Sequence, residues 1–174
     1  HAQSSTILTD TQETYPLGLH LEYLEDKEGL WTIEDITSPE LSQQFVPSEE
    51  ETPGFGFTNS AYWIKFQVRN EADTTIPGLL VVDSYLFYID VYVPTTNGYG
   101  FDVVQTGTAR PYDARAIDHP KFLFDLPIPS GAEQTIFARF ESESAMNLSL
   151  SVWSAHAIAQ DDLVSQMLSG FLYG

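Results

Sequence analysis

The feature that most constrains the fold is a repeated alternation of apolar and polar residues between residues 61 and 153. In residues 61–69, for example, Tyr62 and Ile64 on one face alternate with Trp63 and Lys65 on the other. Such alternation indicates β-strands with one buried face, and turn residues separate the stretches. This pattern favours an all-β fold, an antiparallel β-sandwich of jelly-roll type, over βαβ units. Seven stretches follow the pattern: 61–69, 78–83, 87–93, 101–105, 122–126, 134–140 and 148–153.

The chain of 174 residues is long enough for one domain with a substantial core. Its residues are 43% hydrophobic and only 18% charged, a balance that is typical of a folded protein rather than of a disordered acidic segment. We expect a flexible N-terminal segment at residues 1–16, the sandwich at residues 17–156, and a short helical segment at residues 157–174. In this last segment, apolar residues from Leu163 to Phe171 fall on one helical face.

Charge and cysteine content exclude several classes of function. The chain has 25 acidic and 7 basic residues, a formal charge of −18, and the basic residues form no run. Nucleic acids and anionic membranes would be repelled, whereas cations, neutral sugars and proteins remain candidate partners. Residues 1–60 hold twelve acidic residues and one basic residue, so −11 of the charge lies there. The absence of cysteine excludes disulfides, cysteine-based zinc sites and thiol catalysis.

Motifs of catalysis are lacking in the sequence, including HExxH, GxSxG and phosphate-binding glycine loops. We therefore expect a binding domain rather than an enzyme, with no cofactor except calcium. Acidic loops favour calcium because it binds several carboxylate and carbonyl oxygens. The alternative is that the same acids form a solvated surface. The candidate calcium ligands are Asp83, Asp90, Asp113 and Asp118.

A sugar site needs aromatic rings and hydrogen-bonding side chains in one groove. Trp63 and Lys65 share the polar face of one expected strand, and Arg115 lies in the loop between Gly107 and Phe122. The guanidinium of Arg115 would bind the hydroxyls or the carboxylate of a ligand, or else pair with a neighbouring acid and fix the loop. For the aromatic residues, the alternative is a place in the core. The candidate ligand-binding residues are Trp63, Lys65, Tyr85, Tyr92, Tyr112, Arg115 and His119.

A series of short motifs, in a fixed order, covers nearly the whole chain from about residue 17. They are Tyr23–Asp26, Trp31–Ile36, Phe55–Phe57, Ser60–Phe66, Ile89–Val93, Gly107–Arg115, Phe122–Phe124, Phe137–Ser142 and Gly170–Gly174. With these motifs the chain resembles the second type of extracellular sensor domain of bacterial seven-transmembrane receptors with diverse intracellular signalling modules. The family pattern commonly has Arg where this chain has Lys65, whereas Arg115 matches an Arg of the pattern.

The resemblance implies a periplasmic jelly-roll sensor, similar to carbohydrate-binding modules, that precedes a seven-helix membrane segment. It also implies a histidine kinase of a two-component system, or a diguanylate cyclase, as output. We predict the extracytoplasmic ligand-binding domain of a membrane receptor, with residues 157–174 leading to the first membrane helix. The expected ligand is a carbohydrate or an envelope glycan. The alternatives are a calcium-sensing domain, and a protein-interaction module that pairs with itself or with another receptor's sensor domain.

Overall fold

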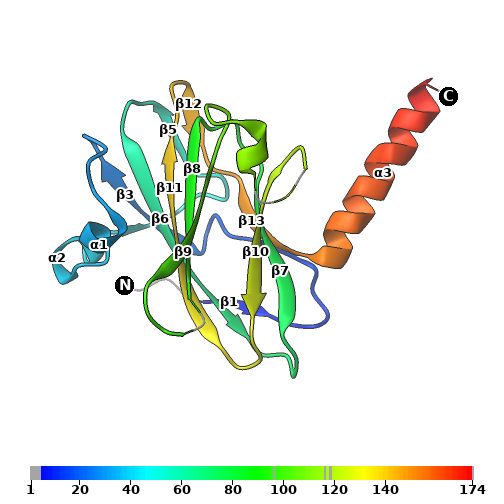
Figure 1. The fold of residues 1–174 in the computed structure, drawn as a ribbon, viewed down its shortest axis with the longest axis horizontal. Helices are drawn as coiled ribbons and strands as arrows, with labels where there is room; N and C mark the ends of the chain where they lie inside the picture. Colours follow the sequence, from blue (N-terminus) through cyan, green and yellow to red (C-terminus); the bar gives the residue numbers. More distant parts are fainter. Residues whose placement is uncertain (1–4, 96, 116, 118, 174) are drawn as a thin grey trace.

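The computed structural model describes residues 5–173 except 96, 116 and 118, and for residues 165–173 it describes the helical backbone alone. Two β-sheets pack face to face, and a C-terminal helix leaves one side of the sandwich (Figure 1). The larger sheet has the strand order β4-β3-β6-β11-β8-β9, and the smaller has the order β10-β7-β13-β2. Neighbours along both orders are antiparallel, so the predicted all-β antiparallel sandwich is confirmed.

The elements have the following bounds. The larger sheet contains β3 (Leu21–Asp26), β4 (Val46–Pro47), β6 (Ala61–Asn70), β8 (Tyr88–Pro94), β9 (Phe101–Thr106) and β11 (Glu133–Glu141), with β1 (Thr6–Leu8) attached to β6. The smaller sheet contains β2 (Thr14–Pro16), β7 (Ile76–Val82), β10 (Phe122–Ile128) and β13 (Leu150–Ser154). The strands β5 (Gly54–Phe57) and β12 (Ala145–Asn147) pair separately. The helices are α1 (Ile33–Ile36), α2 (Pro39–Ser42), the 3₁₀ turn η1 (Tyr112–Ala114) and α3 (Ala155–Tyr173).

The main core lies between the two sheets and follows from the alternation in the strands. In β6, Ile64, Phe66 and Val68 are fully or almost fully buried in it. From the smaller sheet, Leu80 and Phe124 face them in the same cluster. Burial of one such side chain stabilises the fold by about 1.5–3 kcal/mol. The apolar half of each alternating stretch is therefore what holds the sheets together.

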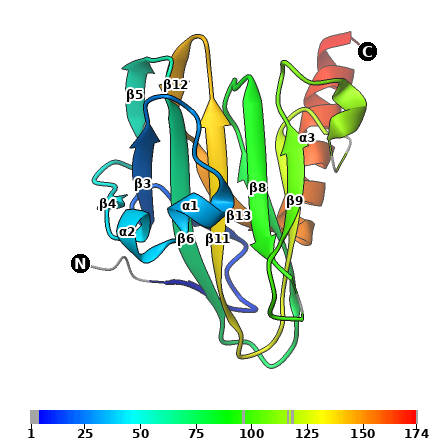
Figure 2. The same cartoon turned by 60° about the vertical axis from the view of Figure 1, so that its left-hand side comes forward.

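A second apolar cluster lies on the opposite face of the larger sheet. There α1 lies over β6 and β11, with α2 beside it at the lower end of β3 (Figure 2), and Ile36 of α1 packs with Trp63 and Phe137. Local sequence forms this cover, because the hydroxyl of Thr32 accepts from the backbone N–H of Asp35, and the Asp35 carboxylate accepts from that of Thr32. The sheet face on which Trp63 lies is thus covered here and forms no open ligand platform.

The N-terminal segment departs from the prediction. Residues 1–16 were expected to be flexible, yet β1 pairs in parallel with β6, and β2 pairs with β13 at the edge of the smaller sheet. Leu8 is fully buried, and the hydroxyl of Tyr15 bonds to the backbone of Thr9 and Gln12. Three-residue strands are too short to show alternation, which is why the sequence pattern missed them.

The helix α3 packs on the sandwich only near its beginning. Ile158 is buried against Leu79, Val81 and Leu123 on the outer face of the smaller sheet. Beyond these residues the helix points away from the sheets (Figure 1), and Leu163 is half exposed. The helix has 19 residues, and its bounds agree closely with the helical segment predicted at residues 157–174. Within the described part of the chain, no helix combines the length and apolarity that crossing a membrane requires.

Candidate functional site

Loops at one end of the sandwich form an open pocket of about 370 Å³. Three predicted site residues line it: Asp83 and Tyr85 from the loop after β7, and Arg115 from the loop before β10. The side chain of Tyr85 is 68% exposed, so its ring is available to a ligand. The complete lining is Val82, Asp83, Ser84, Tyr85, Thr108, Arg115, Pro120, Lys121 and Phe122.

Backbone hydrogen bonds fix the loop that presents Tyr85. The N–H of Asp83 donates to the carbonyl of Ser149 at 3.0 Å, and the N–H of Ser149 donates to the hydroxyl of Ser84 at 2.9 Å. The next residue, Leu86, is fully buried in the main core. Tyr85 is therefore held outward between two anchored positions, which prepares its ring for binding without a folding step.

Arg115 forms the opposite wall of the pocket. Its Nη1 donates to the carbonyls of His119 and Pro120 at 2.6 and 3.2 Å. The guanidinium also lies 4.1 Å from the ring centre of Phe122 and 4.5 Å from that of Tyr112. Tyr112, another predicted site residue, is exposed but supports Arg115 and does not line the pocket. Arg115 thus fixes its own loop through two backbone carbonyls while it stands at the pocket wall.

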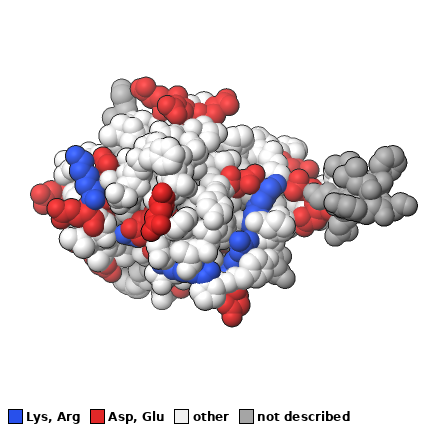
Figure 3. Space-filling model, turned by 90° about the horizontal axis from the view of Figure 1, so that it is seen from above, with Lys and Arg blue, Asp and Glu red and all other residues white. Residues whose placement is uncertain are grey.

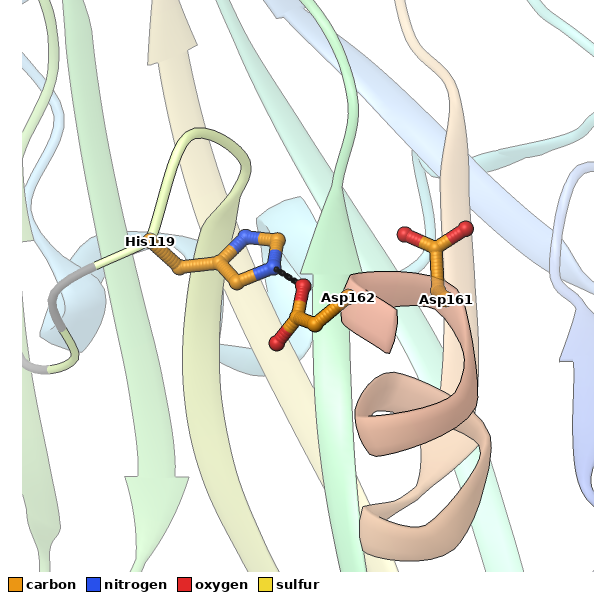
Figure 4. A group of neighbouring side chains, drawn as sticks. All are labelled: His119, Asp161 and Asp162. Atoms are coloured by element: carbon orange, nitrogen blue, oxygen red, sulfur yellow. Dashed lines mark hydrogen bonds and ion pairs between the residues drawn. The ribbon is translucent and has the colours of Figure 1, made fainter. Parts of the chain in front are cut away.

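The same loop is joined to α3 by two pairs of side chains. His119 Nε2 lies 2.7 Å from a carboxylate oxygen of Asp162, as Figure 4 shows. Lys121 Nζ lies 3.2 Å from a carboxylate oxygen of Asp161 and 5.0 Å from the ring centre of Trp153. His119 itself is buried and does not line the pocket. The pocket loop and the beginning of α3 are therefore in direct contact.

His119, Asp161 and Asp162 form the one group of potential metal ligands found among the described residues, with ligand atoms within 4.8 Å of one another. However, the backbone N–H of Lys121 donates to His119 Nδ1 at 3.0 Å. A neutral imidazole then carries its proton on Nε2, where it donates to Asp162. A metal at Nε2 would require the ring to lose this proton, and the ammonium of Lys121 already pairs with Asp161. We therefore assign this group to contacts within the protein rather than to a metal.

Among the described residues, no group of potential metal ligands contains Asp83, Asp90 or Asp113, three of the four aspartates predicted as calcium ligands. Asp83 and Asp113 are exposed, and Asp118 lies outside the described residues. Asp90 is buried, with one carboxylate oxygen 2.7 Å from Arg110 and the other 4.0 Å from Arg139. Its prediction as a calcium ligand is corrected here, because two guanidinium groups occupy the space that a cation would need.

Three further predicted residues lie on the covered face of the larger sheet. Trp63, expected as an aromatic platform, is fully buried beneath the helical cover and is corrected to a core residue. Lys65 pairs with Glu22 at 3.4 Å. Tyr92 packs between Trp63 and Phe101, and burial raises the pKa of its hydroxyl, with the carboxylate of Asp90 raising it further. None of the three lines the pocket.

The pocket brings basic side chains together on a chain that is strongly acidic overall. Arg115 and Lys121 line it with a single carboxylate, that of Asp83. Viewed from this end in Figure 3, Lys and Arg side chains form a band that reaches the base of the C-terminal helix, with Asp and Glu side chains around it. Another hollow, beside β4 and β5, is lined by Glu49 and Glu50 and by no basic residue. Among the side chains that line the pocket, basic groups thus outnumber acidic ones by two to one, and Asp161, which pairs with Lys121, lies just outside the lining.

Sequence reasoning missed several residues of the pocket, including Ser84, Thr108 and Lys121. Only Lys121 carried a usable signal, since it is one of seven basic residues and stands two positions after His119. Ser84 and Thr108 meet because the ends of β7 and β9 converge through backbone bonds to Leu86 and Phe87. That convergence depends on the topology, which alternation alone does not give.

Comparison with known proteins identifies one family. The 7TMR-DISM extracellular 2 family matches residues 18–154, which is most of the chain. No curated protein matches the sequence.

Three similar solved structures are carbohydrate-binding modules, and they share little sequence with this chain. CsCBM6-3 from Clostridium stercorarium, solved with cellobiose, is 12% identical over 59% of this chain and 81% of its own, with a TM-score of 0.32. A family 6 carbohydrate-binding module is 8% identical over 76% and 92%, with a TM-score of 0.32. CpGH89CBM32-6, produced by Clostridium perfringens, is 9% identical over 62% and 79%, with a TM-score of 0.31. Likeness at this level says nothing about a ligand.

Proposed function

Because the chain belongs to the 7TMR-DISM extracellular 2 family and is thus an extracytoplasmic sensor domain of a membrane receptor, we propose that it binds a carbohydrate of the cell envelope or the surroundings. The proposed site is the pocket between the loops after β7 and before β10. The observation that carries the proposal is the exposed ring of Tyr85 beside the polar side chains of Asp83, Arg115 and Lys121.

This set of side chains suits a sugar. One face of a pyranose presents C–H groups that pack on an aromatic ring, and its edge presents hydroxyls. Around Tyr85, the carboxylate of Asp83 would accept from hydroxyls, and the ammonium of Lys121 would donate to them. The anchored loops would keep these groups in place before the ligand arrives, which lowers the entropic cost of binding.

Signalling would follow from a difference in affinity between two states of the receptor. A ligand shifts an equilibrium only by as much as it prefers one state over the other. Since α3 contacts the pocket loop through His119 and Lys121, it would transmit that preference toward the membrane. The output proposed from the family is a histidine kinase or a diguanylate cyclase.

The proposal is tested by thermal unfolding of the domain against a panel of neutral and acidic sugars, calcium and magnesium. A ligand at a hundred times its Kd stabilises the folded state by about 2.7 kcal/mol, which raises the Tm by several degrees. We expect at least one sugar to do so, and Tyr85→Ala to abolish the shift. The control is Tyr99→Ala, which removes a ring that lies outside the pocket and is even more exposed than that of Tyr85.

Two results would overturn the proposal. If no sugar raises the Tm but millimolar calcium does, the domain is a calcium sensor, as the acidic loops first suggested. If neither sugars nor calcium raise the Tm and the domain self-associates, the domain is a protein-interaction module and the sugar-binding proposal is wrong. A sugar shift that survives Tyr85→Ala would leave the function in place but move the site elsewhere.

A further inference from the structure

We propose that the ligand is an acidic sugar, one that bears a carboxylate; this inference rests on the proposed function. We propose further that Lys121 binds this carboxylate by giving up its ion pair with Asp161. Lys121 both lines the pocket and pairs with Asp161 of α3. Binding in the pocket and packing of α3 therefore depend on one ammonium group. A sugar site in general requires neither an acidic ligand nor a change of ion-pair partner at Lys121.

The charge balance of the pocket favours an anion. The side chains that line the pocket include two basic groups, Arg115 and Lys121, and one carboxylate, Asp83, whereas the whole chain carries −18. The second carboxylate nearby, Asp161, lies outside the lining and pairs with Lys121, so an anionic ligand that displaced it would leave the ammonium neutralised. Uncharged donors suffice for the hydroxyls of a neutral sugar, so two basic side chains at one site favour a ligand that also carries a negative charge. A carboxylate on the ligand would gain a charge-assisted hydrogen bond, which is about twice as strong as a neutral one. The basic band seen from this end of the sandwich (Figure 3) would also attract an anion toward the pocket.

The pair of Lys121 and Asp161 is suited to exchange. Both side chains are partly exposed, at 25% and 35%, and their separation is 3.2 Å. Partly exposed ion pairs contribute only about 0–1 kcal/mol, so a better-placed carboxylate can displace Asp161. The four-carbon stem of lysine lets the ammonium swing between two partners. Arg115 is less free to move, because two carbonyls hold its Nη1.

Loss of the ion pair between Lys121 and Asp161 would weaken the contact between α3 and the pocket loop without detaching the helix. His119 would still donate to Asp162, and Ile158 would stay buried against the smaller sheet. The helix would thus lose one of its two polar contacts with the pocket loop and keep its apolar one. Binding of the acidic sugar and the ion pair between Lys121 and Asp161 weaken each other by the same factor. Removal of the Asp161 carboxylate must therefore raise the affinity for the acidic sugar by that factor.

The experiment compares matched sugars, glucose with glucuronate and galactose with galacturonate, by calorimetric titration of the whole chain. We expect an acidic member to bind about tenfold more tightly than its neutral partner, the ratio that one charge-assisted hydrogen bond supplies. Lys121→Met should remove that preference. Asp161→Asn should raise affinity for the acidic sugar by about two- to fivefold, the measure of a partly exposed pair. Asp162→Asn is the matched control on the same helix and should leave that affinity unchanged.

Amide hydrogen exchange provides a second test, because it measures how firmly the first turns of α3 are held. Glucuronate or galacturonate should speed amide exchange in the first turns of α3 of the native chain, and should have no such effect in Lys121→Met. Equal affinity for acidic and neutral sugars would overturn the acidic-ligand inference and leave the proposed function standing. If the domain prefers acidic sugars but Asp161→Asn does not change its affinity for them, Lys121 does not give up Asp161 on binding, and this part of the proposal is wrong. Failure of every sugar would instead overturn the proposed function itself.

Discussion

Two regions of this sandwich carry the same kinds of residues and use them in opposite ways. The covered face of the larger sheet holds Trp63, Tyr92, Asp90 and Arg139, and there the charges are paired and the rings packed. The loop end holds Tyr85 with Asp83, Arg115 and Lys121, and there the tyrosine ring faces solvent. Aromatic and charged residues in proximity are therefore no sign of a binding site until their partners are known.

The largest expected effect comes from Trp63→Ala. Trp63 is fully buried and its indole N–H lies 3.4 Å from the carboxylate of Asp26, so truncation should lower the free energy of unfolding by about 3–5 kcal/mol. Denaturant unfolding measures this, with Tyr85→Ala as control, which should change stability by less than about 0.5 kcal/mol. Equal losses at both positions would show that the covered face and the loop end do not differ.

Asp90→Ala should have the next largest effect. It leaves Arg110 and Arg139 without the carboxylate between them, and loss of a hydrogen bond to a charged group destabilises by about 1.5–3 kcal/mol. The matched control is Asp83→Ala at the exposed loop end, which we expect to be nearly neutral in stability but to weaken sugar binding. If calcium stabilised the native domain and this stabilisation vanished in Asp90→Ala, the ion-pair assignment would be wrong.

Arg115→Ala tests whether the loop end needs its own support. Loss of the bonds to His119 and Pro120 should lower the free energy of unfolding by about 1 kcal/mol, since the group is partly exposed. Sugar affinity should fall as well, because the pocket wall loses its fixed position. Arg115→Lys keeps the charge but lacks the planar guanidinium, so affinity equal to that of the native chain in this variant would rule out the proposed wall geometry.

The smallest effect should appear at alkaline pH. Burial raises the pKa of Tyr92 above its ordinary value of 10.0, with Asp90 adding to the effect, and the pKa of Tyr62 is raised in the same way. The unfolded chain then loses these protons first, so the free energy of unfolding should decline as the pH rises above about 10. In Tyr92→Phe the decline should be shallower. An unchanged slope would mean that the covered face does not desolvate this hydroxyl.

Much of the fold could be predicted from the sequence because alternation reports burial directly. Tyr62, Ile64, Phe66 and Val68 face the core as their spacing requires. Trp63 was misjudged because alternation identifies the second face of a strand but not what covers it, and the cover comes from residues 32–42, far away in sequence. The paired strands β1 and β2 were missed for a related reason, since each has only three residues.

The pocket was predicted only in part. Asp83, Tyr85 and Arg115 were expected and lie together, whereas Lys121 was not singled out. Its significance depends on Asp161, which lies forty residues away in the sequence. Asp161 lies in the second turn of α3, where it reaches the loop. Only the packing of α3 on β7 and β13 brings that pair together.

The most direct test of the central claim, that the loop end and not the sheet face receives the ligand, is a titration of the isotope-labelled domain with an acidic sugar, followed by amide chemical shifts. The largest shifts should fall at residues 82–85, 108, 115 and 120–122, with a smaller set at the beginning of α3. Shifts concentrated at Tyr88, Asp90, Tyr92 and Arg139 instead would contradict it and place the ligand on the covered face.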